Sequence, residues 1–331
     1  MVYKKKLIIL GSSAVFLALV YVLSLVLDPE RINARNERFT WLPADFRTGA
    51  DRIEIIRGGG RFELVLKNGA WVALVDSTVD STGDSAAAPT EVPAKQGRID
   101  DLFRILSSRG AFPRRGSNAA SHSELGLDGS TRLIIRGGAG LPLLDLLVGK
   151  EDPSGRAVFL RKNGENEFRS GDRLIGTYVH GEKSSWFDLK LFEELSAAQV
   201  QRIQVRFSGY TGTGEEDPPV EFTDYTIARS GENWIMDGTT LDKEKTEAWI
   251  RNVLEAQGED ALPLTDEAFF AEIAGIRIEL GDGSSLELRI GTAGEDGKSA
   301  ALVSGKSYRI VLPQWTVLRL LRDRLYFRYA P

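Results

Sequence analysis

Residues 52–71, RIEIIRGGGRFELVLKNGAW, predict a β-hairpin that leads to a tryptophan. From Arg52 to Ile55 polar and apolar residues alternate, as they do in a strand with one buried face. Three glycines at 58–60 follow as a turn, and a second alternating run leads to Trp71. This segment therefore predicts the start of an antiparallel sheet.

The same order of elements returns in the second half of the chain. Residues 202–207 alternate in the same way, and a second strand over 222–228 leads to Trp234. An amphipathic helix is predicted after each tryptophan, because apolar residues recur at helical spacing. These residues are Ile99, Leu102, Phe103 and Leu106 in the first half, and Trp249, Ile250, Val253 and Leu254 in the second, where Asp242 is the predicted N-cap.

Further hairpins and a closing helix are predicted behind each amphipathic helix, so the order β-β-α-β-β-β-β-α is written twice. The closing helices are expected over residues 186–195 and 315–329, and polar loops over 75–95 and 209–219. The predicted fold class is α+β, with two tandem modules of antiparallel sheet, each with helices packed on one face.

Residues 7–27 carry no charged side chain and follow Lys4, Lys5 and Lys6. As a helix they would span roughly 30 Å, the thickness of a bilayer core, which predicts a transmembrane helix. The lysines place the amino terminus in the cytoplasm and the bulk of the chain outside it. No small-residue cleavage site ends the segment, which favours an uncleaved single-pass signal anchor over the alternative of a cleaved signal peptide.

The domain organisation follows from these elements. We expect a cytoplasmic stub at 1–6, a transmembrane anchor at 7–27, a linker at 28–49, a first α+β module at 50–195 and a second at 196–331. The net charge is −5, and without the three lysines the exported part has 39 basic and 47 acidic residues. This acidic balance argues against nucleic acid as a partner. The chain has no cysteine, which excludes disulfides, thiol catalysis and a lipoprotein anchor.

Several short motifs give the chain a resemblance to a known family. In chain order they are WLPAD at 41–45, GAW at 69–71, ELGLD at 124–128, LVGK at 147–150 and FLR at 159–161. Together they resemble the bacterial membrane-anchored family of the domain of unknown function DUF4340. Members of that family are often encoded beside an ABC-type transporter and a gliding-type auxiliary membrane protein, so the resemblance implies a setting in the bacterial inner membrane and no catalytic residue. The second half departs from the pattern with Ile290-Gly291-Thr292 and has no clear LGLD.

No catalytic, cofactor-binding or metal-binding residue is predicted, and no cofactor. His122 is expected at a helix start and His180 in a loop, each without the convergent partners that a metal or general base needs. Lys150 follows a strand into a turn, so a hairpin corner is favoured over a phosphate site. The acidic runs at 100–101 and 215–217 are interpreted as solvated charge, and the basic spots at 113–115 and 319–328 are too small for nucleic acid.

Three hypotheses for function remain. The leading one is a non-enzymatic, membrane-anchored accessory or scaffold subunit of an ABC-type export or cell-envelope complex, with protein partners and no nucleic acid. The first alternative is an envelope module that binds glycan or lipid in a groove between the modules, where Tyr178, Trp186 or Tyr210 would be exposed. The second is a hydrolase that uses a pair of carboxylates.

Overall fold

The structure is a computed structural model of the 331-residue chain. It describes residues 16–21, 39–43, 45–46, 49–75, 89–108, 112–129, 131–193, 195–210, 222–264 and 270–328. Of the predicted anchor at 7–27, residues 16–21 are described and helical; its other residues, like the predicted stub at 1–6, lie outside the described part. No helix in the described residues has the length and apolar character to cross a membrane.

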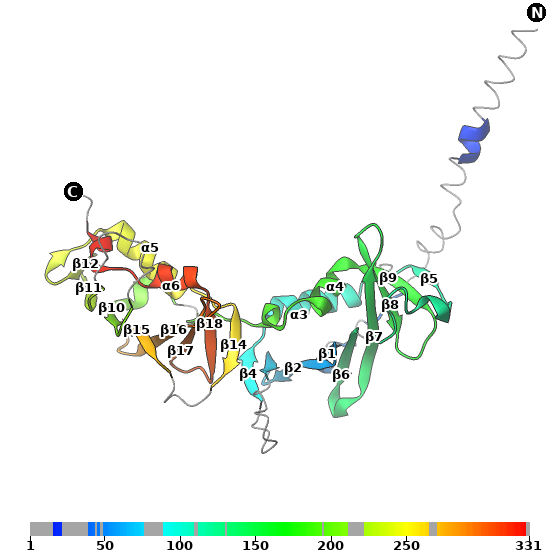
Figure 1. Ribbon diagram of the computed structural model, residues 1–331, viewed down its shortest axis with the longest axis horizontal. Helices are drawn as coiled ribbons and strands as arrows, with labels where there is room; N and C mark the ends of the chain where they lie inside the picture. Colours follow the sequence, from blue (N-terminus) through cyan, green and yellow to red (C-terminus); the bar gives the residue numbers. More distant parts are fainter. Residues whose placement is uncertain are drawn as a thin grey trace, which may run out of the picture. The chain divides into compact units, whose positions relative to one another are not determined.

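The two predicted antiparallel sheets are present, each with nine strands (Figure 1). The strands of the first sheet are β1 (Ala50–Arg57), β2 (Gly60–Lys67), β3 (Ala70–Val75), β4 (Thr90–Pro93), β5 (Arg114–Gly116), β6 (Thr131–Gly137), β7 (Pro142–Glu151), β8 (Ala157–Lys162) and β9 (Phe168–Asp172). Their order in the sheet is β4-β3-β2-β1-β6-β7-β8-β9-β5.

The second sheet repeats this order. Its strands are β10 (Val200–Phe207), β11 (Tyr225–Ser230), β12 (Asn233–Met236), β13 (Thr239–Thr240), β14 (Asp260–Pro263), β15 (Glu272–Leu280), β16 (Ser285–Ala293), β17 (Ser299–Val303) and β18 (Tyr308–Leu312). They lie in the order β13-β12-β11-β10-β15-β16-β17-β18-β14, which is the first order with nine added to each number. The predicted repeat is therefore confirmed at the level of sheet topology.

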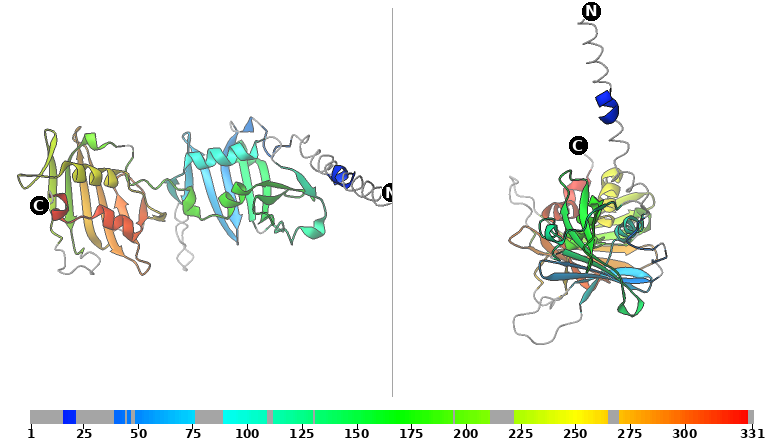
Figure 2. Two further views of the ribbon diagram at one scale, coloured as in Figure 1. Left: turned by 90° about the horizontal axis from the view of Figure 1, so that it is seen from above. Right: turned by 90° about the vertical axis from the view of Figure 1, so that its right-hand side faces the viewer.

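The helices of each sheet lie on one of its faces, as Figure 2 shows. In the first sheet these are α3 (Gln96–Leu106), between β4 and β5, and α4 (Arg173–His180), which follows β9. In the second they are α5 (Lys243–Leu254) and α6 (Gln314–Leu320), at the matching places in the chain. The apolar faces predicted for α3 and α5 are buried, and the Asp242 carboxylate accepts a hydrogen bond from the Lys245 backbone N–H, as expected of an N-cap.

The chain divides into two compact units that do not coincide with the two sheets. One unit contains the described parts of Met1–Arg61 and Gln96–Gly181, and the other those of Phe62–Lys95 and Glu182–Pro331. The predicted modules at 50–195 and 196–331 follow the sheets instead, and as domain boundaries they stay a prediction.

The two tryptophans of the repeat occupy matching places. Trp71 is the second residue of β3, Trp234 is the second residue of β12, and both side chains are buried. Each tryptophan carbonyl accepts a backbone N–H from the residue two positions before the next helix, Ala94 in the first sheet and Leu241 in the second. The predicted equivalence of the two residues is thus confirmed.

Four strands precede the first helix of each sheet, β1–β4 before α3 and β10–β13 before α5, where the sequence predicts two. The tryptophan does not end the hairpin but begins a further strand, since Asn68 and Gly69 adopt φ of 51° and 82° and form a tight two-residue turn. Asp237 and Gly238 make the same kind of turn, with φ of 51° and 76°, before the short β13. Part of the predicted loop at 75–95 is also wrong, because Thr90–Pro93 pairs with β3 as the edge strand β4, where a proline is tolerated.

The closing helix predicted over residues 186–195 is wrong. The helix is α4, which begins earlier, where the Asp172 carboxylate accepts the Leu174 backbone N–H at 2.8 Å. Residues 186–192 instead form a largely buried connector in the second unit. The connector forms two isolated antiparallel β-bridges, one between Phe187 and Ala94 and one between Lys190 and Gln257. In the second sheet the predicted segment 315–329 is shorter than expected, with α6 and then a 3₁₀ turn at Arg324–Phe327.

The face of the second sheet opposite its core carries charged side chains that pair across the strands. Ile203 and Val205 of β10 are buried, so Arg202 and Arg206, at alternating positions, lie on the opposite face. Arg206 contacts Glu287 at 2.8 Å, and similar pairs join Arg202 to Glu279 and Arg289 to Glu272. We call this surface the charged face; its residues are Arg202, Arg206, Glu272, Glu279, Glu287 and Arg289.

Candidate functional site

Three of the five family motifs, ELGLD, LVGK and FLR, meet at one junction in the first unit. The ELGLD segment lies against the end of β7, where the Lys150 backbone N–H donates to the Leu125 carbonyl at 2.9 Å. The Lys150 ammonium donates to the Glu124 carbonyl at 3.0 Å. Lys150 lies within β7, next to its last residue, so the structure places it in the strand and not in the predicted hairpin corner that follows. The third motif joins them, because Arg161 Nη2 donates to the Leu127 carbonyl at 2.8 Å.

Both motif glycines are required by the backbone at this junction. Gly126 adopts φ of +72°, which residues with a side chain rarely adopt. At Gly149 the chains approach so closely that a Cβ would lie 2.3 Å from the Leu125 carbonyl oxygen. Leu127, Leu147 and Phe168 pack together beneath the junction. These two motif glycines are therefore explained by folding. In the second sheet a Cβ at Gly291 would lie 3.0 Å from the Phe270 ring, so close packing is kept there although no LGLD segment is present.

The two histidines contact backbone carbonyls. His122 follows a short 3₁₀ turn rather than starting a helix, and its Nε2 lies 2.9 Å from the Asn166 carbonyl oxygen. His180 is not in a loop but is the last residue of α4, with Nε2 3.3 Å from the Gly149 carbonyl oxygen. Within the described residues no group of three His, Asp or Glu side chains is arranged to hold a metal ion.

The acidic and basic runs behave largely as solvated charge. In α3, Asp101 pairs with Arg104 at 2.9 Å, and both side chains are exposed. Arg114 pairs with Glu167, and Arg319 donates to Asn252. The acidic run at 215–217 lies outside the described residues.

A buried carboxylate that the sequence did not single out is Glu54 of β1, only 1% exposed. Arg136 donates to it from β6, and Arg61 lies 3.1 Å away. Burial alone would raise the pKa of Glu54, but the hydrogen bond from Arg136 and the charges of Arg61 and Arg136 outweigh it. The pKa of Glu54 therefore lies below its ordinary value of 4.5. This cluster stabilises the sheet.

Replacing Glu54 with glutamine should destabilise the folded chain by about 1–3 kcal/mol at neutral pH, because two arginines lose their carboxylate. A lowered pKa contributes stability above the unfolded pKa, and this contribution is lost as the pH falls. The difference in unfolding free energy between wild type and Glu54→Gln should therefore be constant near pH 7 and shrink below about pH 4.5. Urea unfolding at several pH values measures it. Asp101→Asn, at an exposed pair, is the control and should change stability little; a pH-independent difference for Glu54→Gln would contradict the expectation.

The three aromatic residues predicted to line a binding groove do not share one site. Tyr178 and Trp186 are buried, and the Arg98 guanidinium lies 4.5 Å from the Tyr178 ring centroid. Tyr210, which follows β10, lines a pocket of the second unit. Its ring packs against Phe207 and Phe222.

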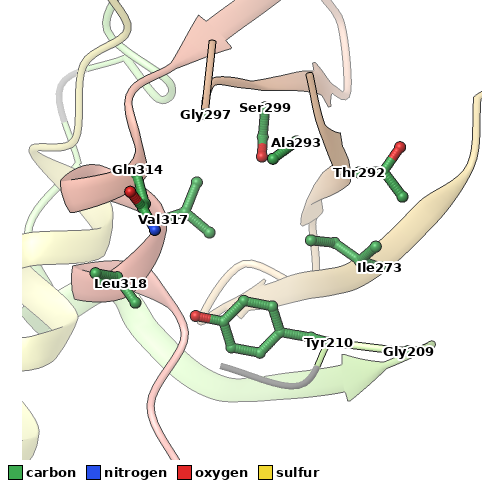
Figure 3. Close-up of a pocket in the computed structure, with 10 residues that line it drawn as sticks. All are labelled: Gly209, Tyr210, Ile273, Thr292, Ala293, Gly297, Ser299, Gln314, Val317 and Leu318. Carbon is green, nitrogen blue, oxygen red and sulfur yellow. The ribbon is translucent and has the colours of Figure 1, made fainter. Parts of the chain in front are cut away.

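The Tyr210 pocket has a volume of about 230 Å³ and is built by strand ends and one helix. Figure 3 shows the Tyr210 ring between β15 and α6, facing Ile273 and Leu318 across the opening. Apolar groups form much of the wall, and the polar side chains that line it are Thr292, Ser299 and Gln314. None of the described lining residues is a carboxylate, an imidazole or an amine, so this pocket offers hydrogen bonds and apolar contact but no acid–base pair.

The fold defines a class: an α+β protein of two repeated antiparallel sheets, each with helices on one face. The chain belongs to the family of the domain of unknown function DUF4340, which matches residues 85–268, more than half of its length. The resemblance found in the sequence is thus confirmed. No curated protein and no solved structure matches the chain.

Proposed function

We propose that this chain is a non-enzymatic accessory or scaffold subunit of an ABC-type export or cell-envelope complex. In this proposal residues 7–27 anchor it in the bacterial inner membrane as a single span, and the two sheets stand on the extracytoplasmic side. The protein partners are the membrane-embedded subunits of that complex.

The observation that carries the proposal is the repetition of one sheet with a helix-covered face and a second face left to contact other molecules. The repetition gives one chain two copies of such a face. On the second sheet this surface is the charged face, whose arginines and glutamates lie on the three neighbouring strands β10, β15 and β16. Such paired charges favour specific partners with a complementary pattern.

Two further features support the setting. The apolar segment at 7–27 behind three lysines has the length and charge bias of a single-pass anchor. The family motifs carry the resemblance to membrane-anchored proteins encoded beside ABC-type transporters. The Tyr210 pocket supports binding over hydrolysis, because its described lining residues include no carboxylate pair.

The full chain, purified from washed membranes in mild detergent, should bring down subunits of an ABC-type transporter, identified by mass spectrometry. Reversing two charges of the charged face, Arg206→Glu with Arg289→Glu, should reduce their recovery at least about tenfold, because like charges across an interface cost several kcal/mol. Both arginines are partly exposed, so the fold should survive the change.

The control is Lys243→Glu, which makes the same kind of charge change at an exposed position on the helix side of the same sheet. It should retain the partner. Recovery of the chain in the soluble fraction, or wild-type eluates without any transporter subunit, would contradict the proposal. Equal loss of the partner in both variants would contradict the role of the charged face.

A further inference from the structure

Trp315, the second residue of α6, is 59% exposed. A single exposed apolar side chain is common on protein surfaces, so the surroundings of Trp315 decide whether it belongs to a site. By contrast, the chain buries Trp71, Trp186, Trp234 and Trp249. Trp315 therefore differs in exposure from these four tryptophans.

The surroundings of Trp315 are polar and concave. A pocket of about 220 Å³ lies beside it, between the end of α5 and α6. Its polar lining side chains are Asn252, Glu255, Gln257, Thr316 and Arg319. Arg319 donates to Asn252 Oδ1 at 2.6 Å and lies 5.7 Å from the Trp315 ring centroid, so the amide and the guanidinium are held in place beside the indole.

A second pocket, of about 430 Å³, shares Glu255 and Gln257 with the first. Its other polar lining residues include Lys190, Glu193, Ser196 and Gln199. The buried connector fixes the shared wall, because Leu191 donates its backbone N–H to Ala256 and Gly258 donates to Leu189, both at 2.9 Å. We call the two pockets together the Trp315 trough.

The side chains of the trough suit a ligand rich in hydroxyl groups. Amides offer both donors and acceptors, as sugar hydroxyls do, and an exposed indole presents a flat apolar face to the C–H face of a sugar ring. Glu193 and Glu255 balance Lys190 and Arg319, so the lining carries no excess charge that would select a polyanion or a polycation.

We propose that the Trp315 trough binds a neutral oligosaccharide, with one sugar stacked on Trp315 and the next units hydrogen-bonded by Asn252, Gln257 and Gln199. This binding site goes beyond the scaffold function and does not depend on the transporter partner. It lies at a different place from the groove expected from sequence, where Tyr178 and Trp186 are buried.

The first sheet supplies a natural comparison. Leu174 is the second residue of α4, as Trp315 is of α6, and it is also exposed, at 41%. An aliphatic side chain covers apolar surface but offers no aromatic face for a sugar. Leu174→Ala is therefore the matched control, because it truncates the exposed side chain at the equivalent helix position.

The test is isothermal titration calorimetry of the full chain in detergent with maltohexaose, mannohexaose and N-acetylated chitohexaose, and with hexagalacturonate as the anionic counterpart. At least one neutral hexasaccharide should bind and hexagalacturonate should not. Trp315→Ala should weaken binding at least about tenfold, as expected for the loss of an aromatic stack. Trp315→Tyr should restore part of it, Asn252→Ala should weaken it, and Leu174→Ala should leave it unchanged.

Thermal melting of each variant checks that the fold is intact. The proposal is overturned if none of the three neutral sugars binds, if binding survives Trp315→Ala, or if Leu174→Ala weakens it equally. Should Trp315→Ala instead release a transporter subunit while no sugar binds, Trp315 belongs to a protein interface and the glycan site is rejected. Retention of the transporter partner is read separately, so failure here leaves the scaffold proposal standing.

Discussion

Trp234→Ala should lower the free energy of unfolding by about 3–5 kcal/mol, the range for truncation of a large buried aromatic residue. The Trp234 side chain is 1% exposed, and the Arg229 guanidinium lies 5.4 Å from its ring centroid. Truncation would leave a cavity under β12 beside the strand that leads into α5. Because Trp71 holds the matching place in β3 and is also buried, Trp71→Ala should cost a similar amount.

Guanidinium unfolding of the full chain, followed by circular dichroism, measures both losses. The control is Trp315→Ala, which removes the same side chain from an exposed position and should leave stability nearly unchanged. If Trp71→Ala or Trp234→Ala unfolds at the wild-type midpoint with an unchanged slope, the two residues do not support the cores of the repeated sheets.

Gly149→Ala should destabilise the first unit by at least about 2–3 kcal/mol, because the added methyl group forces an overpacked contact. The new Cβ would lie 2.3 Å from the Leu125 carbonyl oxygen and 3.0 Å from a Leu127 methyl carbon. Moving that carbonyl would break its hydrogen bond from the Lys150 N–H. The family motif therefore requires glycine here for steric reasons.

Gly138→Ala is the matched control, since a Cβ at Gly138 meets nothing within 4 Å and its φ lies outside the left-handed region. It should melt within about a degree or two of wild type. Hydrogen exchange of the β7 and 124–128 backbone gives a local measurement, and faster exchange there in Gly149→Ala alone is expected. Equal melting of both variants would show that the junction can shift at little cost.

The larger outlines of the fold follow from local patterns in the sequence. Alternation located β1 and β10, helical spacing located α3 and α5, and Asp242 marked a helix start. The strands β3 and β12 were not predicted, because each begins one residue before the tryptophan at which the sequence pattern places the end of the hairpin. The two-residue turn Asn68-Gly69 leaves no other loop residues before β3 to mark a new strand. The helix α4 was missed because Gly176 and β-branched residues interrupt its signal. Residues 186–192 have the apolar spacing of a helix, but they form an extended connector because their backbone N–H groups donate to the Pro93 and Ala256 carbonyls.

The sites were less predictable than the fold. Glu54 sits at an ordinary polar position of an alternating strand, and its pairing with Arg136 depends on contact between residues 82 positions apart in the chain. Whether an aromatic residue is exposed is likewise decided by the tertiary packing. Trp186 and Trp315 look alike in sequence, but one is fully buried and the other lies open to solvent. Asn252 and Gln257 lie far from Trp315 and Arg319 in the sequence, so their order along the chain does not predict the Trp315 trough.

The two sheets of this chain have the same strand order, so a strand of one could pair with a strand of the other during folding. The side chains of the central strand pairs, β1 with β6 and β10 with β15, oppose this exchange. In the native pairs β1 faces β6 and β10 faces β15 in the same register, with Arg202 opposite Glu279 and Arg206 opposite Gly275. If β10 paired with β6 instead, the same register would set Arg206 against Arg132, where β1 has Ile56, while Arg202 would face Arg136 as Arg52 already does in the native pair. Like charges directly opposite destabilise a strand pair, and β10 carries Gln204 where β1 carries the neutralising Glu54. These two differences between the copies disfavour the exchange of β10 for β1, which is one way in which a tandem chain can avoid misassembly.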